Sequence, residues 1–219
     1  MSEILTSTQN NFLRDFFGRS QEFYLTGGTA LSTFYLQHRY SEDLDFFTND
    51  DVAFRRAENI VMDACSALNI SFSSIRLTSY FKHFSVGDAN DFLTLHFAKD
   101  VSYHLKPSNV FEGIVVDSLE DIAANKICAV LGRTEIKDLI DLFFLGQAGY
   151  GMFEYFPYAQ QKDGGLTDET LAYALSQFSI KRIPEFMIKP LTTDELKKFL
   201  EALIERLIQR SLPSFSNDQ

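Results

Sequence analysis

Two acidic residues one position apart are the clearest chemical signal in this chain. Asp43 and Asp45 flank Leu44 in the strand-like segment 43–47, Asp-Leu-Asp-Phe-Phe. Side chains two apart on a strand share a face, so the carboxylates project together while Leu44 and Phe46 enter the core. Such a pair predicts Mg²⁺, which takes oxygen ligands and leaves positions open for substrate phosphates. Two acids that simply point into water are the alternative.

A pair of glycines lies upstream of the acids. Gly27 and Gly28 follow the strand-like residues 23–25, and Thr29 is expected to cap the helix that begins after them. Glycines at such a turn let the backbone approach a ligand closely, and the amides at a helix start favour phosphate. Taken alone, this motif could be an ordinary glycine turn. Together with the acids it favours a phosphate cradle beside a metal.

A lysine interrupts the apolar face of a later predicted helix. In the helix expected over 118–131, Lys126 falls between Ile122 and Val130, and Arg133 lies near the edge of that face. Lysine is rarely buried without a partner. Either the side-chain stem reaches water, or the ammonium group faces a carboxylate or phosphate in a cleft.

The next predicted helix, 136–148, carries two more acids. Asp138 lies beside Leu142 and Leu145, on a side that is not simply solvent-exposed. Asp141 has Lys137 four residues before it, and a surface pair of that spacing contributes only a few tenths of a kcal/mol.

The elements that must position these residues indicate a mixed α/β part followed by helices. Residues 149–165 are expected to be a linker, so we predict a domain over 1–148 and a helical C-terminal region over 149–219 packed on it. Thr192 with Glu195 forms a capping box that starts the last helix. The remaining predicted elements are an opening helix around 12–17, a helix over 50–68, and strands over 70–77, 80–86 and 92–97.

Composition excludes several classes of protein. The chain of 219 residues has a net charge of −10, so it is not expected to coat DNA or RNA broadly. No apolar run is long enough for a membrane helix, and the first residues do not resemble a signal peptide. Cys65 and Cys128 are far from any histidine cluster. A reduced cytoplasmic protein is therefore expected.

Two segments resemble a known family. Residues 27–47, GGTALSTFYLQHRYSEDLDFF, resemble the signature of the AbiEii/AbiGii abortive-infection toxins, which are polymerase-β-like nucleotidyltransferases. Residues 121–145, DIAANKICAVLGRTEIKDLIDLFFL, resemble that family's second block. The resemblance covers about the first two thirds of the chain.

The resemblance implies an α+β fold, in which a mixed sheet flanked by helices carries the metal carboxylates and a helical C-terminal part follows. It also implies a toxin that transfers a nucleoside monophosphate from an NTP to an RNA or protein acceptor. Mg²⁺ or Mn²⁺ would be the cofactor, transfer RNA ends are among the known acceptors of the group, and an antitoxin would be the partner.

The resemblance also implies roles for single residues. Asp43 and Asp45 would hold the metal, and Asp138 would be a base or a substrate-positioning group. Arg39 and Ser41 also match the family: Arg39 would bind the nucleotide, or both residues would only brace the loop. Gly27, Gly28 and Thr29 would hold the triphosphate of the NTP, and Lys126 would contact phosphate.

One position departs from the family pattern. A third carboxylate is usual on a later strand, but His96 stands in that place, with Asp91 and Asp100 only at the strand's ends. Imidazole is a poor Mg²⁺ ligand, so the metal could be held weakly or replaced. If the face with Thr94 and His96 points at the acid pair, His96 could itself be the general base.

Two alternatives to an active transferase follow from the sequence. The first is a catalytically lapsed relative that binds a nucleotide or a partner protein. The second is a phosphatase with an Asp-x-Asp nucleophile pair, which is disfavoured because Thr48 lies one place late for that motif and no fitting later acidic cluster follows.

Overall fold

A seven-stranded mixed sheet carries the acidic pair. In the computed structural model, which describes residues 4–87, 91–101 and 103–212, the strand order is β3-β4-β5-β2-β1-β7-β6. β2 runs antiparallel to β1 and parallel to β5, while β1 runs parallel to β7. The strands are β1 Tyr24–Thr26, β2 Leu44–Thr48, β3 Ser71–Leu77, β4 Phe81–Gly87, β5 Phe92–Lys99, β6 Asn109–Phe111 and β7 Ile114–Val116.

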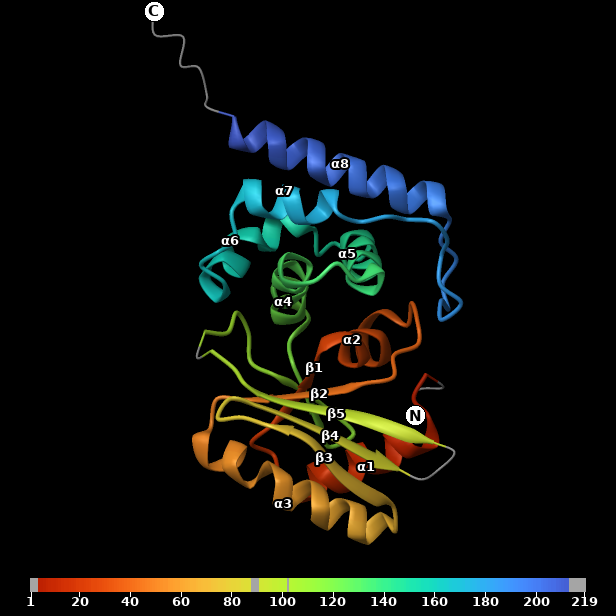
Figure 1. Cartoon of the computed structure of the whole chain (residues 1–219), viewed down its shortest axis with the longest axis vertical. Helices are drawn as coiled ribbons and strands as arrows, with labels where there is room; N and C mark the ends of the chain where they lie inside the picture. Colours follow the sequence, from red (N-terminus) through yellow and green to blue (C-terminus); the bar gives the residue numbers. More distant parts are fainter. Residues whose placement is uncertain (1–3, 88–90, 102, 213–219) are drawn as a thin grey trace, which may run out of the picture. The chain divides into compact units, whose positions relative to one another are not determined.

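Helices cover both faces of this sheet. α1 Ser7–Arg19 and α3 Asp51–Leu68 lie on one face, and α2 Gly27–Ala30 lies on the other and continues as the π-helix η1 Leu31–Leu36 (Figure 1). Between α1 and the sheet, the ring of Phe46 stacks on Phe97 at 4.7 Å and lies 4.6 Å from Phe16. All three rings are fully buried, and each such burial contributes about 1.5–3 kcal/mol. This core fixes the orientation of β2, and with it the face on which the acids project.

The second part of the chain is helical. Phe143 of α5 meets Phe199 of α8 edge to face at 5.3 Å. The capping box predicted at Thr192 is confirmed, because its hydroxyl accepts a hydrogen bond from the Glu195 amide. The helices are α4 Leu119–Gly132, α5 Ile136–Gln147, α6 Met152–Lys162, α7 Asp168–Ser176 and α8 Thr193–Ser211. The α+β prediction, with a helical C-terminal part, is confirmed.

The predicted linker over 149–165 is wrong. Its middle forms α6, although Pro157 lies inside that helix and glycines flank it. The helix forms because Met152, Tyr155, Phe156 and Ala159 are buried together, at the spacing of one helical face. That spacing is present in the sequence, but the glycine, aromatic and polar content of 149–165 favours a linker.

The hairpin of β6 and β7 was not predicted. Its strands have three residues each, and Phe111 pairs with Ile114 across a turn in which Glu112 and Gly113 both have positive φ. Such a two-residue turn matches the right-handed twist of the flanking strands. Strands this short show too few alternations to be recognised from periodicity.

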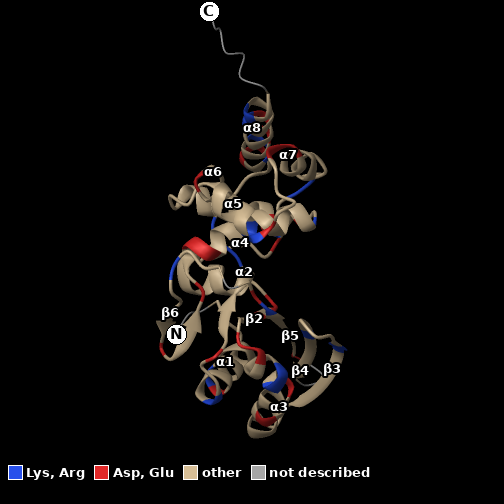
Figure 2. Ribbon diagram, turned by 90° about the vertical axis from the view of Figure 1, so that its left-hand side faces the viewer, with Lys and Arg blue, Asp and Glu red and all other residues tan. Residues whose placement is uncertain are grey.

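The chain forms two compact units, Met1–Ile122 and Ala123–Gln219. Both α1 and α3 of the first unit carry basic and acidic residues (Figure 2). Both cysteines are free thiols. None of the described helices combines the length and the apolar character that crossing a membrane requires.

Candidate functional site

The two acids lie where the sequence placed them, at the start of β2. Leu44 and Phe46 are fully buried on one face, while Asp43 and Asp45 are half-buried on the other. The alternation predicted for this strand is therefore confirmed. It leaves two carboxylates side by side on the face of the sheet that α2 covers (Figure 1).

The glycine turn lies directly against one of these acids. Gly27 has φ +71°, a conformation that L side chains rarely adopt, and a Cβ added to it would overlap the Asp45 carboxylate. A Cβ on Gly28 would likewise overlap the Arg39 guanidinium. At Gly27 the positive φ and the nearby carboxylate both favour glycine, whereas at Gly28 a side chain would require the Arg39 guanidinium to move.

Thr29 does not cap the helix, so that prediction is wrong. The N-cap of α2 is Thr26, and the Thr29 hydroxyl instead donates a hydrogen bond to the backbone carbonyl of Asp43. The helix therefore begins three residues earlier than predicted, with Gly27 as its first residue. Thr29 thereby ties α2 to the residue that carries the first acid.

Buried polar side chains brace the loop before β2. Arg39 is 2% exposed, and its Nη1 donates to the carbonyl of Tyr40 at 2.9 Å. Gln9, also 2% exposed, donates through Nε2 to the carbonyls of Ser41 and Glu42, each at 2.9 Å. Sequence reasoning missed Gln9, because nothing local to α1 shows that its side chain reaches a loop more than thirty residues later.

His96 faces the acid pair. It is the Cα partner of Asp45 in the parallel pairing of β5 with β2, and its Nδ1 lies 3.0 Å from the Asp45 Oδ1. Leu95 and Phe97, its neighbours along β5, are fully buried on the opposite face. The face assigned to His96 from the sequence is therefore confirmed.

A second histidine, not singled out in the sequence, lies next to the first. His83 of β4 is the cross-strand partner of His96, with ring centroids 4.8 Å apart. Burial lowers the pKa of His83, His96 lowers it further, and Asp43 acts in the opposite direction. The neutral imidazole is thus the favoured form of His83 in the folded protein.

The donor set around Asp45 suits a hard cation only in part. Two carboxylates match Mg²⁺, whereas the His96 imidazole suits softer ions. Among the described residues, the acids and histidines whose ligand atoms all lie within 4.8 Å of one another are His104, Asp117 and Asp121. Asp43, Asp45 and His96 are not drawn together that closely, so substrate phosphates and water would have to complete a metal shell there.

The cluster of His104, Asp117 and Asp121 has a structural explanation. Asp121 accepts hydrogen bonds from the amides of Leu105 and Lys106 and from the Ser118 hydroxyl. Asp117 accepts from the Thr26 hydroxyl at 2.8 Å. These donors hold the start of α4 and the loop before it, and they occupy the carboxylate oxygens that a metal would need.

The remaining predicted residues lie in the second unit. Lys126 is 4% exposed, and its Nζ lies 2.9 Å from the Asp138 Oδ1 and 2.6 Å from the Asp141 Oδ2. Arg133 binds both oxygens of Asp138, at 2.7 and 3.2 Å. Burial alone would raise the pKa of Asp138, but Lys126 and Arg133 outweigh it and hold that pKa below its usual range.

This network decides between the two alternatives for Lys126 and corrects one expectation for Asp141. Lys126 does have a structural reason to be charged, because two fully buried carboxylates face it. The surface pair of Asp141 with Lys137 is not formed, since Asp141 is fully buried on Lys126 and the Lys137 Nζ lies 2.9 Å from Glu135. Periodicity showed that these residues were unusual, but it could not show that they meet.

Comparison with known proteins gives a consistent result. The family model "Nucleotidyl transferase AbiEii toxin, Type IV TA system" matches residues 11–217. No curated protein matches the chain. A crystal structure from H. pylori, provisionally described as a nucleotidyltransferase, is 22% identical with a TM-score of 0.56, covering 95% of this chain and 100% of that one.

Two further solved structures are similar to this chain. JHP933 from Helicobacter pylori is 22% identical with a TM-score of 0.55, covering 92% of this chain and 91% of that one. MenT4, a nucleotidyltransferase toxin from Mycobacterium tuberculosis, is 13% identical with a TM-score of 0.49, covering 94% of this chain and 83% of that one. At these identities the likeness concerns the fold.

Proposed function

The chain belongs to the AbiEii family of nucleotidyl transferase toxins, and on that premise we propose that it transfers a nucleoside monophosphate from an NTP to an RNA or protein acceptor. One observation carries the proposal: the Gly27 turn lies directly against the Asp45 carboxylate. A backbone that can approach phosphates and a carboxylate that can hold their counter-ion are thus adjacent.

The residues of the first unit have separate proposed roles in binding the nucleotide and the metal. Gly27, Gly28 and Thr29 would cradle the triphosphate, and Arg39 would hold the loop in place. Asp43 and Asp45 would hold Mg²⁺ or Mn²⁺. Such an ion, when bound, would neutralise charge on the phosphates and orient the α-phosphate for in-line attack.

His96 is the proposed general base. The acceptor hydroxyl oxygen forms a bond to the α-phosphorus, the bond from that phosphorus to the bridging oxygen breaks, and pyrophosphate leaves. The hydroxyl proton passes to His96, whose Nδ1 lies 3.0 Å from the Asp45 Oδ1. Positioning and charge neutralisation would account for most of the rate enhancement.

Lys126 and Asp138 keep their proposed roles as a phosphate contact and as a base or positioning group. Both side chains already belong to the ion-pair network of the second unit. A role in substrate binding therefore requires Lys126 to share its charge between phosphate and the two carboxylates. We further propose a cytoplasmic toxin whose activity an antitoxin restrains.

A catalytically lapsed nucleotide-binding or partner-binding relative is the second candidate. The observation that favours it is His96 in place of a third carboxylate, already paired with Asp45. Pyrophosphate release separates the two candidates, because a lapsed relative would bind NTP without releasing it.

Thermal unfolding tests the metal and nucleotide site. Ligands that bind only the native state stabilise by mass action, so Mg²⁺ plus NTP is expected to raise Tm by more than the sum of the two separate shifts. Asp45→Asn should abolish this synergy. Asp63→Asn, which changes an exposed acid of α3 in the same way, should retain it. A synergy that survives Asp45→Asn would remove the acid pair from the site.

A further inference from the structure

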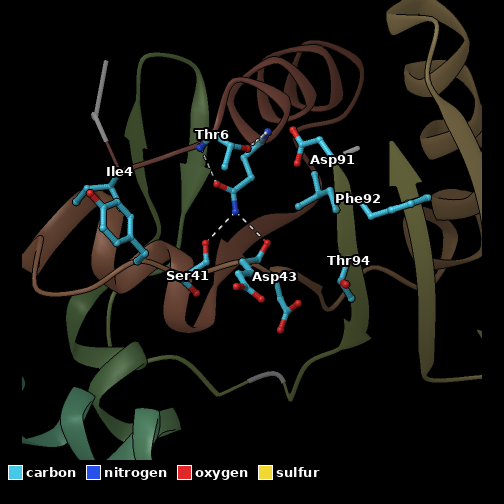
Figure 3. Close-up of a pocket in the computed structure, with 11 residues that line it drawn as sticks. Ile4, Thr6, Ser41, Asp43, Asp91, Phe92 and Thr94 are labelled. Carbon is cyan, nitrogen blue, oxygen red and sulfur yellow. Dashed lines mark hydrogen bonds between the residues drawn. The ribbon is translucent and has the colours of Figure 1, made fainter. Parts of the chain in front are cut away.

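A cavity opens beside Asp43, and the proposed function assigns it no task. Its volume is about 480 Å³. Its walls come from the N-terminal segment around Thr6, the loop that carries Ser41 and Asp43, and the start of β5. Figure 3 shows Asp43 and Thr94 on one side of the cavity and Thr6 and Asp91 on the other. The cavity thus lies within the first unit and borders the proposed metal carboxylates.

The charged side chains that line this cavity are all acidic, and two aromatic rings lie among the other lining residues. Glu42, Asp43 and Asp91 line it, and the described lining residues include no Lys, Arg or His. Two rings also line it with large exposed fractions, Tyr40 at 50% and Phe92 at 66%. A cation is attracted both to carboxylates and to the face of an aromatic ring.

The wall of the cavity is held in place by buried contacts. The Gln9 side chain joins the carbonyls of Ser41 and Glu42 to the Thr6 amide, which donates to its Oε1 at 2.9 Å. At the start of β5, the Thr8 hydroxyl donates a hydrogen bond to the Asp91 carboxylate. These hydrogen bonds hold in place the chain segments that carry Glu42 and Asp91.

The charge of the lining selects among acceptors. A metal bound at Asp43 would offset that acid, and Glu42 and Asp91 are further acidic groups of the lining. Phosphates of an RNA acceptor would be repelled by them, and a net charge of −10 adds to the repulsion. Lysine or arginine beside the reacting group would instead be attracted, and would stack on the exposed rings.

We propose that this cavity receives the acceptor, and that the acceptor is a protein segment in which a hydroxyl side chain is flanked by Lys or Arg. This inference rests on the proposed function. The hydroxyl oxygen gains the bond to the α-phosphorus of the NTP, pyrophosphate leaves with the bridging oxygen, and the hydroxyl proton passes to His96.

Label transfer from a mixture of the four α-³²P-labelled NTPs tests the proposal with three probes. The first is a synthetic peptide with one serine among Lys and Arg, the second has the same serine among Glu, and the third is bulk transfer RNA. The full-length protein should label the basic peptide at least about tenfold faster than the acidic one, since like-charge contacts strongly suppress wrong partners.

Reversing the charge of the lining acids tests whether the preference for the basic peptide arises in this cavity. The double variant Glu42→Lys/Asp91→Lys should lose the preference for the basic peptide, by about tenfold or more. Asp63→Lys, the same reversal at an exposed position outside the cavity, should keep it. The Tm synergy of Mg²⁺ and NTP must persist in the double variant, which shows that it is folded and still binds nucleotide.

Several results would overturn the inference. Labelling of transfer RNA without labelling of the basic peptide would assign the cavity to a nucleic acid or to no acceptor. Failure to label any probe while the parent binds Mg²⁺ and NTP synergistically would also reject it, as would an unchanged peptide preference in the double variant. A parent protein without that synergy would instead refute the proposed function itself.

Discussion

The Nδ1 of His96 lies 3.0 Å from the Oδ1 of Asp45, between strands that pair in parallel. The contact joins the position where a third carboxylate is usual to one of the two proposed metal ligands. Because of this contact, the effect of a substitution at one of the two residues includes an effect on the other. A substitution at His96 acts on the same carboxylate that the nucleotide site requires.

His96 is predicted to act in the chemical step. His96→Ala should lower kcat about a hundredfold or more, the usual contribution of a general base, with NTP affinity kept. His96→Asp should retain or raise activity, because it restores a third carboxylate beside Asp45. Steady-state kinetics with NTP binding measured separately check both. Parent-like kinetics in both variants would show that the ring contributes nothing to transfer.

His83 is predicted to make stability depend on pH. Because burial and His96 lower its pKa, the unfolded chain binds a proton more readily than the folded chain below about pH 6.5, the unperturbed histidine value. The free energy of unfolding should therefore fall as pH drops from 7 towards 5.5. His83→Gln should make this dependence shallower. Denaturant unfolding at several pH values with EDTA present measures it, and an unchanged slope in His83→Gln contradicts the assignment.

Gly27→Ala should damage both the fold and the site. The added Cβ would overlap the Asp45 carboxylate in a backbone conformation that disfavours alanine, at a cost of about 1–3 kcal/mol. Gly18→Ala is the matched control, because a Cβ at this exposed position of α1 meets nothing within 4 Å and should add about 0.5–1 kcal/mol. Chemical denaturation measures both variants. Equal stabilities would mean that the turn is looser than the structure shows.

Lys126→Met should be strongly destabilising. It leaves Asp138 and Asp141 buried with less compensating charge, and breaking a buried ion pair costs about 3–5 kcal/mol. Adding Asp141→Asn to Lys126→Met should recover part of that loss, because it removes one of the stranded charges. Equilibrium unfolding of the parent, the two single variants and the double variant forms the cycle that measures it.

The same double variant separates structure from function at Lys126. If the lysine also contacts phosphate, NTP affinity should stay low after stability is partly recovered. Nucleotide binding that returns with stability would limit Lys126 to the ion-pair network.

The sequence by itself determined which way the side chains of β2 point. A period of two is a local property of an extended chain, so Leu44 and Phe46 had to share one face and Asp43 and Asp45 the other. The capping box at Thr192 is equally local, because all of its hydrogen bonds lie within four residues. The Gly27–Gly28 turn was predicted for the same reason, although its effect on the helix start was not.

Only the tertiary structure decided which of these residues meet. His96 reaches Asp45 because β5 pairs in parallel with β2, and Gln9 braces the loop before Asp43 because α1 packs on the same sheet. Asp141 pairs with Lys126 because α4 packs on α5, whereas the local spacing had predicted a pair of Asp141 with Lys137. Periodicity fixes the face on which a side chain lies. The partner on that face is fixed by strand register and helix packing, which depend on residues far apart in the chain.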